Sequence, residues 1–268
     1  NDRALVYDAS RHFVRALSLP VSPWDAVILA DDRLVIASAN ADQPLPLLLL
    51  NNQGRVIRAI NGDSNARRVR SPRWIVRGAS GAIWTMPAQF RWRLEHWDTS
   101  GVEVAALERE PAWFRPYASL LSTTQRVPPQ PSIQGAWFDR AGRLWVLGRS
   151  AGRDWGSGLG PATGRGVVIL DPDRTFDTRF EVFNPATARL VASARFDRSY
   201  ESVVEPGVVM HSVQTSAGWR RAELIRVTLD STADSTTSGG GMVGSGRIAG
   251  MARDARRGQF QHIAAGRR

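Results

Sequence analysis

A short phrase that recurs along the chain constrains its fold more strongly than any other feature of the sequence. The phrase consists of a short apolar strand, a turn that carries Asp, Asn or Gly, and a second short apolar strand. Its turn residues Asp8, Asn51 and Asp98 are 43 and 47 residues apart. A period of about 40 to 50 residues with several strands per unit is typical of the blades of a β-propeller. The copies lie at residues 4–17, 47–60, 94–107 and, more loosely, 180–192.

A second phrase lies between the copies of the first and raises the number of strands per unit to four. A residue suited to a tight turn, such as Asp32 or Gly142, precedes its second strand and indicates a hairpin that needs positive φ. Its copies lie at residues 26–37, 74–85 and 136–146. The sequence therefore predicts an all-β fold, a β-propeller with about four complete four-stranded blades and a half-blade. The predicted blades are 22–61, 71–110, 132–197 and 201–229, and two outer strands of a further blade are 1–19.

Two motifs add a resemblance to a known family. Residues 139–146 read Asp-Arg-Ala-Gly-Arg-Leu-Trp-Val, and residues 182–187 read Val-Phe-Asn-Pro-Ala-Thr. Together with the repeats, they resemble the six-bladed, NHL-like β-propellers of bacterial secreted and cell-surface proteins over about residues 1–229. The resemblance implies six blades, and we therefore expect an N-terminally truncated chain that starts in mid-blade. It also implies a periplasmic or extracellular location.

The last part of the chain differs in composition from the repeats. We expect residues 1–229 to form the propeller, whereas residues 230–268 are rich in Gly, Ser, Ala and Arg and contain few large apolar side chains. Such a segment cannot bury enough apolar surface to offset the entropy lost on ordering, so we predict a disordered tail. A short helix around residues 248–257 is the alternative.

The net charge of +10 suggests a polyanion-binding protein until its source is considered. The chain contains no lysine, so all 35 basic residues are arginine, which indicates a coding bias that acts everywhere rather than a selected basic surface. A local cluster therefore matters more than the total charge. Interleaved Arg and Trp could stack bases and clamp phosphates. We favour a solvated loop beside a core Trp74, and nucleic acid is the less favoured partner. The cluster consists of Arg67, Arg68, Arg70, Arg73, Arg91 and Arg93.

Two predicted loops could contact a partner. The first, at residues 111–131, is rich in proline and could present an exposed aromatic surface, or it could bury its rings against the neighbouring blade. The second, at residues 149–166, is rich in glycine, but a strand follows it where a nucleotide fingerprint requires a helix. We interpret it as a flexible insertion within one blade. The candidate contact residues of the first loop are Trp113, Phe114, Arg115 and Tyr117.

Missing residue types exclude several chemistries. Without cysteine there is no disulfide, thiol nucleophile or thiolate zinc site, and without lysine there is no Schiff base or P-loop. The four histidines lack metal-ligand spacing, and no nucleophile elbow occurs. We predict no catalytic residue, cofactor or resident metal, and no transmembrane segment, because the longest apolar run, at residues 45–50, is too short.

The leading hypothesis is a noncatalytic scaffold or binding module for a protein, peptide or glycan. Two alternatives remain. One is an Arg-rich loop that binds nucleic acid or another polyanion. The other is a calcium-dependent hydrolase of the lactonase type, whose ligands would come from different blades and lack local spacing. Its candidates at the blade entrances are Asp25, Asn40 and Glu205.

Overall fold

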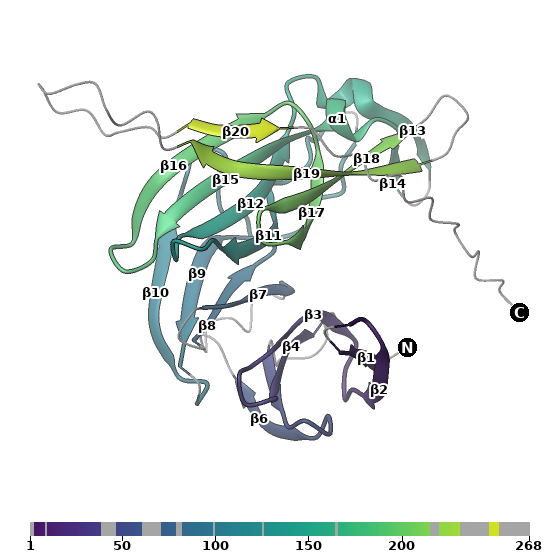
Figure 1. Ribbon diagram of the computed structural model, residues 1–268. Coiled ribbons are helices and arrows are strands. Elements are labelled where there is room, and N and C mark those ends of the chain that lie inside the picture. The colour runs from purple at the N-terminus through teal and green to yellow at the C-terminus, as the bar shows by residue number, and fades with distance from the viewer. Residues whose placement is uncertain are drawn as a thin grey trace, which may run out of the picture.

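The strands form four four-stranded antiparallel sheets, one sheet of two strands at the start of the chain, and one inserted hairpin. The structure is a computed structural model. It describes residues 3–8, 10–38, 47–60, 71–78, 82–98, 100–124, 126–163, 166–214, 220–230 and 247–251. Figure 1 shows the sheets as blades arranged around a common centre, which is a β-propeller arrangement.

The strand order within each blade follows the chain, as the sequence predicts. The half-blade contains β1 (Arg3–Tyr7) and β2 (Phe13–Ser18). The first blade contains β3 (Pro23–Ile28), β4 (Leu34–Ser38), β5 (Leu47–Leu50) and β6 (Val56–Ile60). The second contains β7 (Arg73–Arg77), β8 (Ile83–Pro87), β9 (Trp92–Trp97) and β10 (Glu103–Arg109).

The third and fourth blades complete the arrangement. The third contains β11 (Ser132–Phe138), β12 (Leu144–Ala151), β15 (Phe176–Asn184) and β16 (Arg189–Phe196). The fourth contains β17 (Tyr200–Glu205), β18 (Val208–Gln214), β19 (Arg220–Asp230) and β20 (Arg247–Met251). The inner strands β3, β7, β11 and β17 are neighbours from one blade to the next.

The core consists of apolar layers between successive blades. On β4 the alternate residues Leu34 and Ile36 face the half-blade, whereas Val35 and Ala37 face the second blade. Both faces of β4 are therefore buried, which explains why its sequence is a continuous apolar run rather than an alternating one. Similar layers join the second blade to the third and the third to the fourth.

A repeated turn positions the strands. Asp8, Asn51, Asp98 and Asp139 each accept, through Oδ1, a hydrogen bond of 2.9 Å from the backbone N–H four residues later. The residue three positions after each has positive φ, which suits glycine. These residues with positive φ are Arg11, Gly54, Gly101 and Gly142. Asp32 also has positive φ, as the predicted hairpin requires.

The region between β12 and β15 and the end of the chain differ from the sequence-based expectation. The insertion predicted to be flexible, at residues 149–166, contains the short helix η2 (Trp155–Gly158) and the strand β13 (Leu159–Thr163). Strand β13 forms a hairpin with β14 (Gly166–Ile169), which corresponds to the strand predicted after the insertion. A one-turn helix α1 (Pro172–Thr175) follows, with Asp171 as its N-cap. Within the predicted tail, the structure describes Arg247–Met251, which pairs with β19 as strand β20 and does not form the alternative helix. The rest of the predicted tail lies outside the described residues.

Candidate functional site

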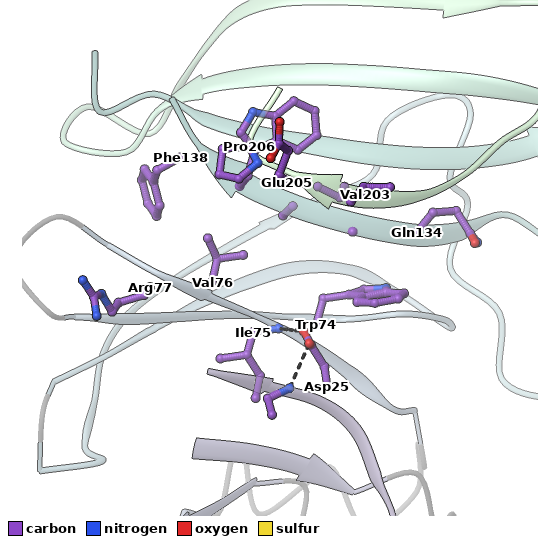
Figure 2. A pocket seen from close by; sticks show the side chains of 15 residues that line it. Asp25, Trp74, Ile75, Val76, Arg77, Gln134, Phe138, Val203, Glu205 and Pro206 are labelled. Carbon is purple, nitrogen blue, oxygen red and sulfur yellow. Dashed lines mark hydrogen bonds between the residues drawn. The ribbon is translucent and has the colours of Figure 1, made fainter. Parts of the chain in front are cut away.

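The inner strands of the four blades line an open cavity of about 450 Å³ that lies between them. Figure 2 shows side chains from all four strands pointing toward it. The lining comes from segments separated by up to about 180 residues in the sequence, so the cavity exists only because the blades share one centre. Its residues are Asp25, Ala26, Trp74–Arg77, Gln134–Phe138 and Val203–Pro206.

Asp25 fastens the first blade to the second at one wall of this cavity. Its carboxylate accepts hydrogen bonds from the backbone N–H of Ile75, at 2.7 Å, and from that of Ala26, at 2.8 Å (Figure 2). Burial raises the pKa of Asp25, although both hydrogen bonds act in the opposite direction. Because each oxygen already serves a backbone donor, this carboxylate acts first as a structural acceptor for the edge of β7.

The other walls come from β7, β11 and β17. Trp74 is half-buried, its ring packs edge to face on that of Trp24, and its Nε1 donates to the backbone oxygen of Ile133 at 2.7 Å. Val203 packs so closely on Gly135 that a Cβ at this glycine would lie 2.7 Å from the valine Cγ2. The blades therefore lock together at the same strands that form the site.

Two exposed charges of opposite sign stand on facing walls. Arg77 donates from Nη1 to the backbone oxygen of Ile28 at 3.2 Å, and Glu205 lies 4.0 Å from Arg226. Figure 2 places Arg77 and Glu205 on different sides of the cavity. Polar and apolar surface contribute about equally to the lining, so the cavity offers a ligand both apolar walls and polar groups.

The structure corrects the interpretation of Arg73 and Arg93 as members of an exposed basic surface. Arg73 is only 4 % exposed and binds Glu95 through both Nε, at 3.0 Å, and Nη2, at 3.2 Å. Arg93 bridges Glu95 at 3.2 Å and Glu103 at 2.7 Å. Arg91 is half-buried. Arg73 and Arg93 belong to the interior and its border, because β9 and β10 of the same sheet carry their carboxylate partners Glu95 and Glu103.

The remaining residues of the predicted cluster, Arg67, Arg68 and Arg70, lie outside the described residues. The same holds for Asn40 in the calcium hypothesis. The other two candidates of that hypothesis, Asp25 and Glu205, both line the cavity. Within the described part of the chain, no three His, Cys, Asp or Glu side chains come together as a group that could hold a metal ion.

The loop at residues 111–131 buries its aromatic rings, which was one of the two alternatives. Phe114 is fully buried in the layer between the second and third blades, and Tyr117 donates from its hydroxyl to the backbone oxygen of Pro131 at 2.9 Å. Trp113 is half-buried, and its Nε1 donates to Glu181 at 3.2 Å. Of the four candidate contacts in this loop, only Arg115 is exposed.

Sequence reasoning missed a polar junction between the third and fourth blades. His211 is buried, and its Nε2 lies 3.0 Å from both carboxylate oxygens of Asp173, which also accepts from the backbone N–H of Ser199. Glu223 lies 3.6 Å from Nδ1. Asp173 lies on another element, 38 residues from His211, and Glu223 lies opposite His211 on the next strand, so no local motif indicates them.

Comparisons with known proteins add little to this description. No family model and no curated protein matches the chain. A protein of unknown function from Bacteroides caccae is similar over 84 % of this chain and 86 % of its own, with 10 % identity and a TM-score of 0.38. AztD from Citrobacter koseri is similar over 96 % of this chain and 71 % of its own, with 12 % identity and a TM-score of 0.33. Because these TM-scores are low, the β-propeller fold is assigned from the arrangement of the four-stranded sheets in the structure.

Proposed function

We propose that the protein is a noncatalytic β-propeller binding module whose partner, a peptide or a protein, inserts a peptide segment into the cavity between the inner strands. The observation that carries this proposal is the cavity of about 450 Å³, to which the inner strands of all four blades contribute. Ligand sites of folded proteins are concave and mostly apolar, with a small number of polar groups that fix orientation. The cavity is concave and has apolar walls, but polar groups make up nearly half of its lining.

The lining favours a peptide over a glycan. A peptide offers apolar side chains for walls such as Val76 and Val203, and charges of either sign for Arg77 and Glu205. A sugar ring would need an aromatic face to stack on. Trp74 is already engaged with Trp24 through its ring and with a backbone oxygen through its Nε1. The other aromatic residues of the lining are engaged as well, because Trp137 is buried and stacks on Trp145, and Phe138 packs against Trp84.

No specific observation favours the two alternatives. The described part of the predicted basic cluster is half-buried or ion-paired, which leaves little of it for a phosphate backbone. The described candidates for a calcium site give two carboxylates on one cavity, whereas calcium takes six to eight oxygen ligands.

Two further inferences rest on the resemblance in the repeats and motifs. We propose that the ring is of the six-bladed, NHL-like type, and that the protein works in the periplasm or outside the cell. None of the described helices is long and apolar enough to span a bilayer. Cell fractionation of the native gene product tests the location, and an experimental structure of that product tests the number of blades.

Substitution of Val204 tests the binding site. Val204 lines the cavity and is 52 % exposed, so Val204→Trp adds a large ring at the mouth without disturbing the interior. Leu224 on β19 is 48 % exposed and does not line the cavity, which makes Leu224→Trp the matched control. Peptides selected from a displayed random library against the wild-type protein serve as probes in fluorescence titrations.

We expect Val204→Trp to lower the affinity for the selected peptides about tenfold or more, because the added ring blocks the cavity and removes the anchoring contacts. The Leu224→Trp protein should bind as the wild type does. Failure to select any peptide, or equal binding by the Val204→Trp protein, would contradict the proposal.

A further inference from the structure

Arg149 occupies an unusual position at the end of β12. It lies opposite Ser132 on β11 and opposite Thr178 on β15, so it belongs to the end of the third blade. Its guanidinium carbon lies 3.9 Å from the centre of the Phe176 ring, at the start of β15. The ring therefore supports one face of the guanidinium.

The charge of Arg149 has no counter-ion among the described residues. Its Nε atom is buried without a hydrogen-bond partner, and no carboxylate lies within ion-pair distance of it in the described part of the chain. Burial lowers the pKa of Arg149, and the charge of Glu201 offsets this only in part. Glu201 itself accepts a hydrogen bond from Ser212 at 2.9 Å, which engages one of its oxygens elsewhere.

Other arginines at blade interfaces differ from Arg149 in this respect. Arg73 binds Glu95 at 3.0 Å, and Arg109 lies 3.4 Å from Glu181. A buried charge without a partner is costly, and unsatisfied buried polar groups in native structures call for an explanation. The simplest explanation is a ligand that supplies the missing negative charge.

We propose that Arg149 binds an oxyanion, either a carboxylate or a phosphate group. The planar guanidinium fork matches the paired oxygens of such groups, and its stacking on Phe176 fixes the plane in which the donors point. Arg149 as a whole is half-buried, so part of the residue is accessible to solvent and to an anion. Arg149 does not line the cavity between the inner strands, and this site is independent of the proposed peptide binding.

Thermal unfolding of the whole protein at constant ionic strength tests the site. Inorganic phosphate and acetate serve as the two probes, and sodium chloride sets the reference. A ligand that binds only the folded state raises the unfolding temperature as its concentration rises. We expect a saturable rise with phosphate, acetate or both in the wild type, and the comparison identifies which oxyanion is preferred.

Two variants make the test specific. Arg149→Gln should abolish the saturable rise, and Arg153→Gln, which changes an exposed arginine two residues after β12, should retain it. Without added anion, Arg149→Gln should be at least as stable as the wild type, because it removes an unpaired charge. Arg149→Lys keeps the charge but loses the fork, and should need about tenfold more phosphate for half-saturation.

Three results would overturn the proposal. The first is the absence of any saturable response to phosphate and acetate in the wild type. The second is an undiminished response in Arg149→Gln. The third is a marked loss of stability in Arg149→Gln without anion, since this would show that Arg149 stabilises the fold through contacts within the protein.

Discussion

Replacement of Glu95 by glutamine should destabilise the propeller more than any surface substitution. Glu95 on β9 is fully buried, and its carboxylate accepts from Arg73 at 3.0 and 3.2 Å, from Thr85 at 2.9 Å and from Arg93 at 3.2 Å. The amide of the Glu95→Gln protein would retain one oxygen acceptor but no negative charge. Arg73, itself only 4 % exposed, would then be a buried cation without a counter-ion.

The size of the effect follows from this arrangement. Removal of one partner of a buried ion pair costs about 3–5 kcal/mol, chiefly because the other charge stays buried. The retained amide oxygen places Glu95→Gln at the lower end, about 3 kcal/mol. For a domain of this size a loss of 1 kcal/mol lowers the unfolding temperature by about 2–4 °C, so we expect a decrease of about 6–12 °C.

The effect should depend on pH in a direction that the structure determines. Burial acts to raise the pKa of Glu95, but the charge and hydrogen bonds of Arg73 outweigh it, and the folded-state pKa lies below its ordinary value. A depressed carboxylate pKa stabilises the folded state above the unfolded-state pKa, and this stability is lost as the pH falls through the folded-state value. The difference between wild type and Glu95→Gln should therefore be full at pH 7 and shrink in acid.

Urea unfolding at pH 7 and at successively lower pH values measures this difference. Glu103→Gln is the matched control, because Glu103 also pairs with Arg93, at 2.7 Å, but is 27 % exposed and should cost less than about 1 kcal/mol. The reasoning is refuted if Glu95→Gln costs no more than this control at pH 7, or if its cost is independent of pH.

Two further substitutions test the packing of the blades and a second buried carboxylate. Gly135→Ala should cost about 1–3 kcal/mol by overpacking against Val203, and Val203→Ala in the same chain should recover part of the loss; additive losses in thermal scans would contradict this clash. Burial raises the pKa of Glu181 despite Arg109, so wild-type stability should fall as the pH rises through the folded-state value. Thermal scans of Glu181→Gln should show its stability relative to wild type increasing with pH, and a decrease would be the opposite result.

The sequence predicts the blades well because the repeat carries its own turn chemistry. The predicted second blade, 71–110, contains β7 to β10, which end at Arg109, and the predicted third blade, 132–197, ends one residue after β16. Each Asp or Asn at the start of the repeated turn accepts a backbone hydrogen bond four residues later, so a local pattern defines the register. Strand β20 escaped prediction because its pairing with β19 compensates for a weak local pattern.

The candidate site is far less predictable, because its members are ordinary in their own neighbourhoods. Arg73 reads as one of many arginines near a loop, and only the pairing of β8 with both β7 and β9 brings Glu95 to it from 22 residues away. The sequence around Phe114 is compatible with an exposed contact or with a core position. Its burial follows from packing between the second and third blades, which the local sequence does not indicate. Asp25 and Glu205 were identifiable as blade-entrance residues, but their shared cavity was not.

The effects of Glu95→Gln and of Arg149→Gln on the free energy of unfolding can be compared directly, because both concern an arginine without a carboxylate partner. Glu95→Gln would leave the buried Arg73 without its carboxylate partner, and Arg149 is already a half-buried arginine without one among the described residues. The loss in the free energy of unfolding measured for Glu95→Gln is therefore an upper limit for the destabilisation caused by Arg149 without an anion. The cost at Arg149 should be smaller, because part of the residue is exposed to solvent and its guanidinium packs on the Phe176 ring. If Glu95→Gln lowers the stability strongly and Arg149→Gln leaves it unchanged or raises it, Arg73 stabilises the fold and Arg149 is free to bind an anion. Equal losses at both positions would assign both arginines to the fold.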